Sequence, residues 1–344
     1  YREEVNVESV ITQRLGVLTP YILTSIVNGY DKETRYHQTL QKDLYEGKDL
    51  QIRSTGLAVT SQNPVLKALA KLVSTQSKLS DFCSINQGIV TGADKVTPSH
   101  QRKYNLQAQV GEGIFILSAQ EQQELSLSAR EKLLFKPWFK NSAIDRWNVK
   151  NDTSYSVLYL DRQTQITPKL EQYLLKFKPI LDHRREVIYH VIPWWQLQWP
   201  RTRSLFESPK IVVPQRSKRN TFGYTEASWY ASADVYFITT HSSQVSLKYY
   251  LALLNSSLYY WWFYFKGKKK GEAFELYQKP LSEVPVKLPS PKQQKALETL
   301  VDQILTLKKN DPQAHIIPLE AKIDGIVAHL YGLTEDEIAV IQPV

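Results

Sequence analysis

The sequence contains no methionine and a single cysteine among its 344 residues. One thiol, Cys83, excludes an internal disulfide framework and any zinc site built from several cysteines. Such sparing use of cysteine is typical of a reducing cytoplasm, so we expect a cytoplasmic protein. Because the chain also begins with Tyr1, the missing methionine indicates either a piece of a longer polypeptide or a sequence from which methionines were lost.

Several active-site patterns are absent as well. The seven histidines form no His-x-x-His or His-Glu-x-x-His pair, so a zinc hydrolase has no support. The only Gly-x-Gly, at Gly111 and Gly113, precedes a strand-like run, whereas a nucleotide-type cofactor loop should precede a helix.

No apolar run is long enough for a convincing membrane span. The strongest candidate, residues 249–265, is short and carries Asn255, Ser256 and Ser257 at its middle. We therefore predict a buried, aromatic-rich helix that ends in a basic loop, and no membrane partner.

Positive charge is plentiful and unevenly distributed. The chain carries a net charge of +9 and has a pI near 9.2. Residues 130–220 contain 18 Lys and Arg against 8 Asp and Glu, whereas residues 296–344 contain 3 against 8. A solvated basic surface is one interpretation, but a charge excess concentrated in the middle of the chain favours a face that binds a polyanion.

The apolar periodicity predicts an α+β fold. Short β-branched or aromatic runs that turn residues bound are expected strands, at residues 113–117, 156–160, 210–213 and 235–240. Residues 63–73 have helical spacing, with Asn63 as a cap. A helix opens at Thr167 and should kink or break near Pro179.

The C-terminus predicts two antiparallel helices and a short third one. Ser290, Pro291 and Gln293 form the start of the first helix, and an apolar stripe from Leu319 to Leu330 belongs to the second helix, which ends at Gly332. Thr334 and Glu337 open the last helix. The acidic outer face of this hairpin is expected to pack on a partner domain and not on DNA.

Residues 85–96, Ile-Asn-Gln-Gly-Ile-Val-Thr-Gly-Ala-Asp-Lys-Val, are the stretch around which we expect the rest of the chain to be organised. Two glycines four apart predict a turn, a brief extended run and a second turn. Gln87, Thr91 and Lys95 offer an amide, a hydroxyl and an ammonium group that suit phosphate and base-edge contacts. An ordinary turn between two strands is the alternative.

Four further clusters are candidate DNA contacts. Residues 193–203 combine three tryptophans with Gln196, Gln198, Arg201 and Arg203, a set that stacks on bases and donates in bidentate fashion. An aromatic cluster that caps a core is the alternative there. The remaining candidates are the paired Arg184 and Arg185, the loop residues Arg216, Lys218, Arg219 and Asn220, and the glycine-flanked Lys268, Lys269 and Lys270. Lysines favour phosphates, whereas arginines suit phosphates and bases.

Several strings resemble the TaqI-like specificity domain of type IIG restriction-modification enzymes and adenine-N6 DNA methyltransferases. They are Gln-Gly-Ile-Val-Thr-Gly-Ala-Asp-Lys at residues 87–95, Gly-Ile-Phe-Ile-Leu at 113–117, Leu-Leu-Phe-Lys-Pro-Trp-Phe-Lys-Asn-Ser-Ala-Ile at 133–144 and Pro-Lys-Ile-Val-Val-Pro at 209–214. Two more follow in order, Tyr-Leu-Ala-Leu-Leu-Asn-Ser-Ser-Leu at 250–258 and Ile-Asp-Gly-Ile-Val-Ala-His-Leu-Tyr-Gly-Leu-Thr at 323–334. The resemblance runs from Lys78 to the C-terminus.

The resemblance implies three parts and a function in bacterial defence. Residues 1–77 would be the tail of an upstream region with a linker, 78–289 a mixed-sheet recognition domain with flanking helices, and 290–344 the helical hairpin. It implies sequence-specific recognition of double-stranded DNA beside a catalytic methyltransferase domain in the same polypeptide or a separate subunit. The parent enzyme would use S-adenosylmethionine and Mg²⁺, but this chain has no Pro-Pro pair, which the family's adenine-binding motif requires. We therefore expect no catalytic residue and no cofactor in this chain.

Two alternatives remain open. A metal-dependent nuclease would use Asp31, Glu46 and Lys48, or else the set Asp311, Glu320 and Lys322, because both sets have the order of carboxylates and lysine that such enzymes use. A non-specific nucleic-acid or anionic-membrane binder would use the positive charge without any sequence preference.

Overall fold

The computed structural model describes residues 6–12, 19–32, 34–40, 45–46, 51–52, 64–104, 106–241 and 244–341. The chain divides into two compact units, Tyr1–Ala70 and Lys71–Val344. The division differs from the predicted boundaries at 77 and 289, since residues 290–341 belong to the same unit as the predicted recognition domain. Asn63 and Lys48 lie outside the described residues.

The first unit contains a two-stranded antiparallel ribbon, β1 (Asn6–Thr12) with β2 (Thr34–Leu40). Helix α1 (Pro20–Val27) lies between them in sequence, and Thr19 caps its first turn. Two short strands, β3 (Tyr45–Glu46) and β4 (Gln51–Ile52), also pair. Strands β2, β3 and β4 thus lie within residues 1–77, where the sequence predicted only a tail and a linker, because a two-stranded ribbon has no buried face to impose an alternating pattern. Helix α2 (Pro64–Val73) crosses the boundary between the units.

The second unit is built on two four-stranded sheets and a small three-stranded one. The first sheet is antiparallel, in the order β11 (Gly223–Thr225), β9 (Lys210–Pro214), β13 (Val235–Thr240), β5 (Cys83–Gln87). The second is mixed, in the order β12 (Tyr230–Ala231), β7 (Phe135–Phe139), β8 (Tyr155–Leu158), β6 (Ile116–Ser118). The third has the order β10 (Arg216–Ser217), β15 (Ala273–Glu275), β14 (Lys269–Lys270).

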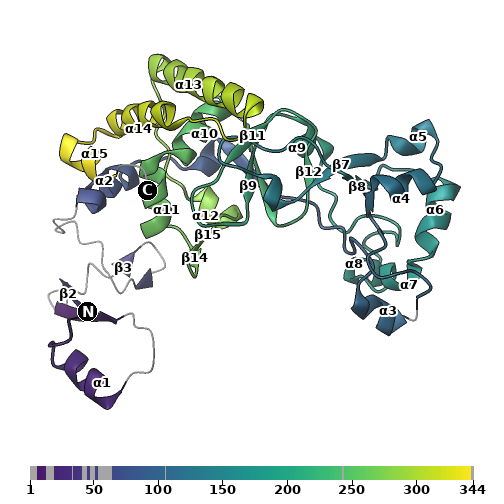
Figure 1. Cartoon of the computed structure of the whole chain (residues 1–344), viewed down its shortest axis with the longest axis horizontal. Helices are drawn as coiled ribbons and strands as arrows, with labels where there is room; N and C mark the ends of the chain where they lie inside the picture. The colour runs from purple at the N-terminus through teal and green to yellow at the C-terminus, as the bar shows by residue number, and fades with distance from the viewer. Residues whose placement is uncertain are drawn as a thin grey trace. The chain divides into compact units, whose positions relative to one another are not determined.

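Helices flank these sheets, so the predicted α+β class with a mixed sheet is confirmed (Figure 1). They are α3 (Pro98–Tyr104), α4 (Ala119–Glu124), α5 (Ala129–Lys132), α6 (Pro168–Leu175), α7 (Lys178–Leu181), α8 (Arg185–Ile188), α9 (Arg203–Glu207), α10 (Leu247–Asn255), α11 (Ser257–Phe265), α12 (Gln278–Ser282), α13 (Pro291–Asn310), α14 (Ile317–Tyr331) and α15 (Glu335–Val340). Two 3₁₀ turns, Leu79–Asp81 and Asn141–Ala143, complete the unit.

An aromatic core joins the two larger sheets. The Trp229 ring stacks on Phe139 of β7, with ring centroids 4.6 Å apart, and meets Phe237 of β13 edge-on at 6.1 Å. Phe206 of α9 stacks on Tyr230 of β12 at 4.5 Å. These buried contacts fix the two sheets against each other, since aromatic pairs bury large areas in defined geometries.

The predicted buried helix over residues 249–265 is two helices, α10 and α11. Ser256, with φ −70° and ψ 160°, interrupts them. The Asp324 carboxylate accepts hydrogen bonds from the Ser257 backbone N–H (2.8 Å) and hydroxyl (2.6 Å), so the second helix begins with a cap supplied by α14. The break escaped prediction because its stabilising partner lies far away in sequence. Among the described residues, no helix is long and apolar enough to cross a membrane.

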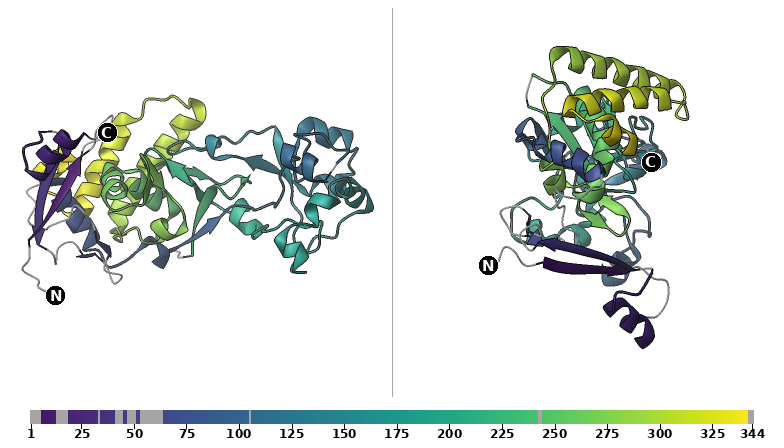
Figure 2. Two further views of the ribbon diagram at one scale, coloured as in Figure 1. Left: turned by 90° about the horizontal axis from the view of Figure 1, so that it is seen from below. Right: turned by 90° about the vertical axis from the view of Figure 1, so that its left-hand side faces the viewer.

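The C-terminal hairpin forms as predicted, and its inner face packs on this chain. Ser290 and Gln293 form a capping box at the start of α13, and Gly332 ends α14 with φ 66°. α13 contacts α10, and α14 contacts α11. Figures 1 and 2 show α13 and α14 side by side along this unit.

One carboxylate organises the start of two helices. Glu131 accepts hydrogen bonds from the Ser128 backbone N–H (2.8 Å) at the cap of α5 and from the Thr167 hydroxyl (2.6 Å) at the cap of α6. The Thr167 bond, followed by the Ser128 bonds, lowers the pKa of Glu131 to about 2. Its ionised form therefore stabilises the fold.

We predict that Glu131→Gln lowers the free energy of unfolding at pH 7 by about 1–2 kcal/mol. Because the folded pKa lies below the ordinary value of 4.5, this stabilisation is present above pH 4.5 and is lost as pH falls toward 2. The stability difference between wild type and variant, from urea unfolding, should shrink by more than half between about pH 7 and pH 2.5. Glu124→Gln, at an exposed position of α4, serves as the control, and an equally pH-dependent difference there would contradict the assignment.

Candidate nucleic-acid interface

Residues 88–92, which follow β5, pack closely against other parts of the backbone, and both Gly88 and Gly92 are required there. The Gly88 N–H donates to the Val235 carbonyl at 2.9 Å, and the Ile89 N–H donates to Ala231 at 2.8 Å. A Cβ atom at Gly88 would lie 2.2 Å from the Ser232 carbonyl oxygen, so no larger residue fits. The close neighbour of Gly88 is therefore the chain's own backbone, at Ala231 and Ser232.

Gly92 marks the second turn. Its φ is +86°, a conformation that L-residues rarely adopt, and a Cβ atom there would lie 2.6 Å from Cδ of Arg184. Between the two glycines, Val90 pairs with Trp199 through bonds of 3.2 and 2.8 Å. The segment after Pro193 is therefore held against residues 88–92.

Arg184 fixes this arrangement from below the surface. The residue is only 6 % exposed, and its guanidinium donates to the carbonyls of Thr91 (3.0 Å), Gln196 (2.8 Å), Trp194 (2.6 Å) and Leu181 (3.1 Å). Burial lowers the pKa of Arg184 to about 10, so the group remains charged at neutral pH. One side chain thus connects three separate segments by hydrogen bonds, and its guanidinium also lies over the Phe115 ring at 5.5 Å.

Arg201 holds the opposite end of the same segment. Its backbone has a left-handed φ of 62°. Its side chain donates to the Gly88 carbonyl and to Oε1 of Gln87, both at 3.2 Å, while its carbonyl accepts from the Tyr159 hydroxyl at 2.8 Å. Partial burial lowers the pKa of Arg201. The strained backbone is thus held by contacts on both sides, as is typical of functional sites.

These contacts surround an open hollow of about 450 Å³, which we call the Trp199 hollow. It is lined by Asp161, Arg162, Gln163, Val191, Ile192, Gln196, Gln198, Trp199, Pro200, Arg201, Thr202 and Arg203. Trp199 is 42 % exposed, whereas Gln196 is only 2 % exposed. Sequence reasoning missed Arg162, because it lies far from residues 193–203 and only the fold brings it there.

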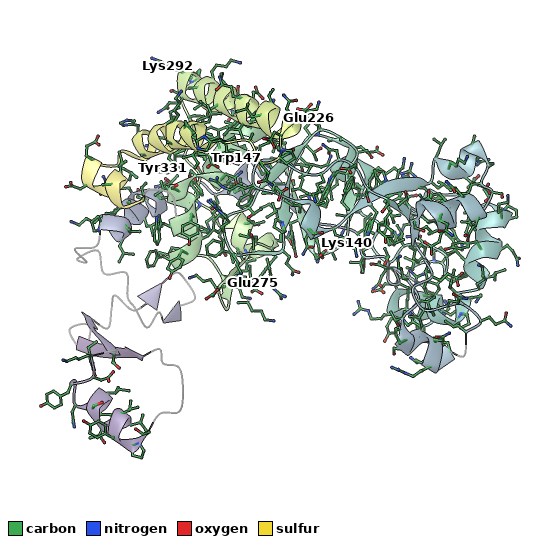
Figure 3. The ribbon with its side chains drawn as sticks, viewed as in Figure 1. Lys140, Trp147, Glu226, Glu275, Lys292 and Tyr331 are labelled. Carbon is green, nitrogen blue, oxygen red and sulfur yellow. The ribbon has the colours of Figure 1, made fainter. Side chains whose placement is uncertain are left out.

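A second cluster of basic side chains lies on the three-stranded sheet, which we call the basic sheet. Strand β15 pairs with β10 on one side and β14 on the other, so two basic segments that are distant in sequence become neighbours. Glu275 of β15 forms ion pairs with Arg216 (3.5 Å) and Lys268 (3.4 Å). Figure 3 labels Glu275 at this hairpin. Lys269 lies 3.4 Å from the Tyr264 ring centroid.

Asn220 anchors the basic sheet and does not belong to its surface. Its side chain is buried and donates to the carbonyls of Leu254 (2.8 Å) and Ser256 (3.0 Å), at the end of α10. In the other direction, the Asn255 side chain forms two hydrogen bonds with the Phe222 backbone. Its Nδ2 donates to the Phe222 carbonyl at 2.8 Å, and its Oδ1 accepts from the Phe222 N–H at 3.2 Å. Two asparagines therefore fix the loop that carries Arg216, Lys218 and Arg219.

Residues 136–286 match the family model of the TaqI-like C-terminal specificity domain. This part of the chain is a TaqI-like specificity domain. The match is shorter than the range that the resemblance predicted, and it contains the basic sheet and all the residues that line the Trp199 hollow. No curated protein sequence matches the chain.

Two solved structures that resemble the chain are those of restriction-modification enzymes. The type IIL enzyme MmeI, solved in complex with DNA, has a TM-score of 0.55 at 17 % identity and covers 77 % of this chain. The type IIG restriction endonuclease BpuSI has a TM-score of 0.43 at 12 % identity and covers 97 % of this chain. The alignments span 35 % of the MmeI chain and 40 % of the BpuSI chain. At these identities the MmeI likeness supports the fold of the specificity domain and nothing further.

The predicted contact residues fall into three classes. Eight are exposed: Arg185, Arg203, Arg216, Lys218, Arg219, Lys268, Lys269 and Lys270. Four are half-buried: Gln87, Lys95, Gln198 and Arg201. Four are buried: Thr91, Arg184, Gln196 and Asn220.

The four buried residues correct the predicted surface. Thr91 hydrogen-bonds Asp94, while Arg184 and Asn220 bond to backbone carbonyls, so these three support the specificity domain and its preceding loop from within. Gln196 lines the hollow but is covered apart from that opening. Lys95 lies over the Tyr155 ring at 4.7 Å, away from the clusters above.

We predict that Arg184→Met lowers the free energy of unfolding by about 2–4 kcal/mol, because buried carbonyls lose their donor. Arg184→Lys should restore little of it, since an ammonium group cannot reproduce the planar fork of a guanidinium. The neighbouring Arg185 is exposed, so Arg185→Met should change stability by less than about 0.5 kcal/mol. Urea unfolding measures all three, and equal effects at the two arginines would contradict the assigned role.

Proposed function

We propose that this chain recognises a specific sequence in duplex DNA, as the specificity part of a type II restriction-modification enzyme. The observation that carries the proposal is the match of residues 136–286 to a specificity-domain family. The exposed basic groups gather within the same residues. DNA binding by this domain would therefore account for the excess of positive charge in the middle of the chain.

The basic sheet supplies the phosphate-binding part of the proposal. Among the described residues, Lys218, Arg219 and Lys270 are exposed and make no ion pair, so they remain available to an anion. Lys268 is engaged with Glu275 and also donates to the Tyr277 hydroxyl at 2.6 Å. Unpaired cations on and directly after the strands of this small sheet suit phosphates, and phosphate contacts set the register of a protein on DNA.

The segment with Trp199 supplies the groups suited to base contact. Gln198 and Arg203 present an amide and a guanidinium, the side chains that read adenine and guanine edges in the major groove. Arg203 is held by Asp161 at 3.4 Å, which limits its freedom and favours one contact geometry. In this scheme the basic sheet positions the duplex through its phosphates, and the residues at the rim of the Trp199 hollow contact its base edges.

The catalytic partner is part of the same proposal. We infer a methyltransferase domain that acts on adenine N6 with S-adenosylmethionine, in the same polypeptide or as a separate subunit, and a Mg²⁺-dependent nuclease in a parent that also cleaves. The outer face of the α13–α14 hairpin is the surface that we assign to such a partner. Its exposed charges are Lys292, Lys295, Lys309 and Lys322 against Asp302, so it is not the acidic face that the sequence predicted. Its inner face is already occupied by α10 and α11.

The nuclease alternative loses one of its two residue sets. Glu320 accepts a hydrogen bond from Nε1 of Trp147 at 2.6 Å and forms an ion pair with Arg146. It therefore serves to fix α14 to the loop before residue 150. In the first set, Asp31 accepts a hydrogen bond from Thr34 at 2.5 Å, and Lys48 lies outside the described residues.

We predict that replacing Lys218, Arg219 and Lys270 together by alanine weakens binding to any duplex about equally and reduces its salt dependence. The slope of log affinity against log salt should fall by about 0.9 for each phosphate that is no longer neutralised, or about 2.7 in total. Titration of a labelled duplex from about 50 to 200 mM salt measures the slope.

A charge-matched variant provides the control. Lys292, Lys295 and Lys309 are exposed on α13, so their joint replacement by alanine removes the same charge from the hairpin. Lys292 is labelled in Figure 3. The slope of this variant should stay within about 0.5 of wild type. Equal reductions of the slope in the two triple variants, or a salt-independent affinity of the wild type, would refute the basic sheet as a DNA face.

A further inference from the structure

Glutamine side chains supply the polar lining of the Trp199 hollow. Gln196 Oε1 is buried and has no hydrogen-bond partner among the described residues. The surrounding backbone is fixed, because the Gln196 carbonyl accepts from Arg184 at 2.8 Å and its N–H donates to Pro193 at 3.2 Å. The Gln196 Oε1 oxygen is enclosed by protein, whereas Gln163 is exposed and Gln198 is half-buried, so the side-chain amides of these two residues are the ones open to a ligand in the hollow.

An apolar face lies in the same hollow. Trp199 is 42 % exposed, and its backbone forms an isolated antiparallel bridge with Val90, which holds the position of the residue. Val191 and Pro200 add further apolar lining. A half-exposed tryptophan beside glutamine side chains is suited to a flat aromatic ligand that carries polar edges.

Cationic groups border the hollow. Arg162 and Arg203 are exposed and Arg201 is half-buried. Of the three, Arg203 is paired with Asp161 at 3.4 Å. Positive groups around an aromatic and amide-lined hollow match a nucleotide, whose base enters while its flanking phosphates stay outside.

We propose that the Trp199 hollow binds one unstacked base of the bound DNA strand. This rests on the proposed function, since duplex DNA must first be held by the chain. A base that stays paired offers only its groove edge, which needs no hollow of about 450 Å³. An extruded base offers its face to Trp199 and its polar edge to the side-chain amides of Gln163 and Gln198.

The test uses duplexes that differ by a single base. The full chain is titrated with a perfect duplex, with the same duplex carrying one unpaired adenine, and with a third in which that nucleotide is abasic. The unpaired nucleotide is placed in turn at each position. Both bulged duplexes share the same backbone distortion, so their affinity ratio isolates the base itself.

We expect the adenine bulge to bind about tenfold more tightly than the abasic bulge at one position, because an unpaired base avoids the cost of unpairing and gains stacking. Trp199→Ala should reduce this ratio to about one, and Trp199→Phe should retain part of it. Tyr21→Ala removes an aromatic side chain that is 83 % exposed in the first unit and should leave the ratio unchanged.

Two results would overturn the inference. One is equal affinity for adenine and abasic bulges at every position, and the other is an undiminished ratio in Trp199→Ala. In either case, salt-dependent binding of the perfect duplex would leave the proposed function standing. Failure of the wild-type chain to bind any duplex would remove both the proposed function and the inference.

Discussion

The structure depends on one buried guanidinium, that of Arg184. Burying a charge without a carboxylate partner is costly, and here the cost is offset by hydrogen bonds to four backbone carbonyls. Those carbonyls come from the end of α7, from the loop after β5 and from the segment that carries Trp199. Gly92 is needed beside it, because any side chain there would collide with Arg184. The wall of the Trp199 hollow is thus a consequence of a hydrogen-bond network below the surface.

Local chemistry made much of this fold predictable. The capping boxes at Ser290 and Thr334, the left-handed end of α14 at Gly332 and the buried strand β9 all follow from residue types within a few positions of each other. The two glycines after β5 were also predictable, because each marks a backbone constraint that only glycine satisfies. The basic middle of the chain was also predictable, because counting charged residues along the sequence requires no knowledge of tertiary contacts.

Tertiary partners decided the rest. Arg184 and Arg185 are adjacent and identical in type, yet one is buried and the other is exposed, and no local pattern distinguishes them. Asn220 belongs to a basic loop in sequence, but the end of α10 captures its side chain. The break at Ser256 depends on Asp324, and Arg162 reaches the hollow only through the fold. Candidate surfaces chosen by residue type alone therefore include the side chains that hold the surface in place.

We propose that the basic sheet contacts phosphates and that the rim of the Trp199 hollow contacts bases. This arrangement predicts that the chain prefers one DNA sequence and does not bind all duplexes with equal affinity. The most direct test is selection of bound duplexes from a randomised pool by the full chain at about 150 mM salt, followed by sequencing. Enrichment of one defined motif is the predicted result. Retention of duplexes without enrichment would contradict sequence recognition by this chain and leave only electrostatic binding.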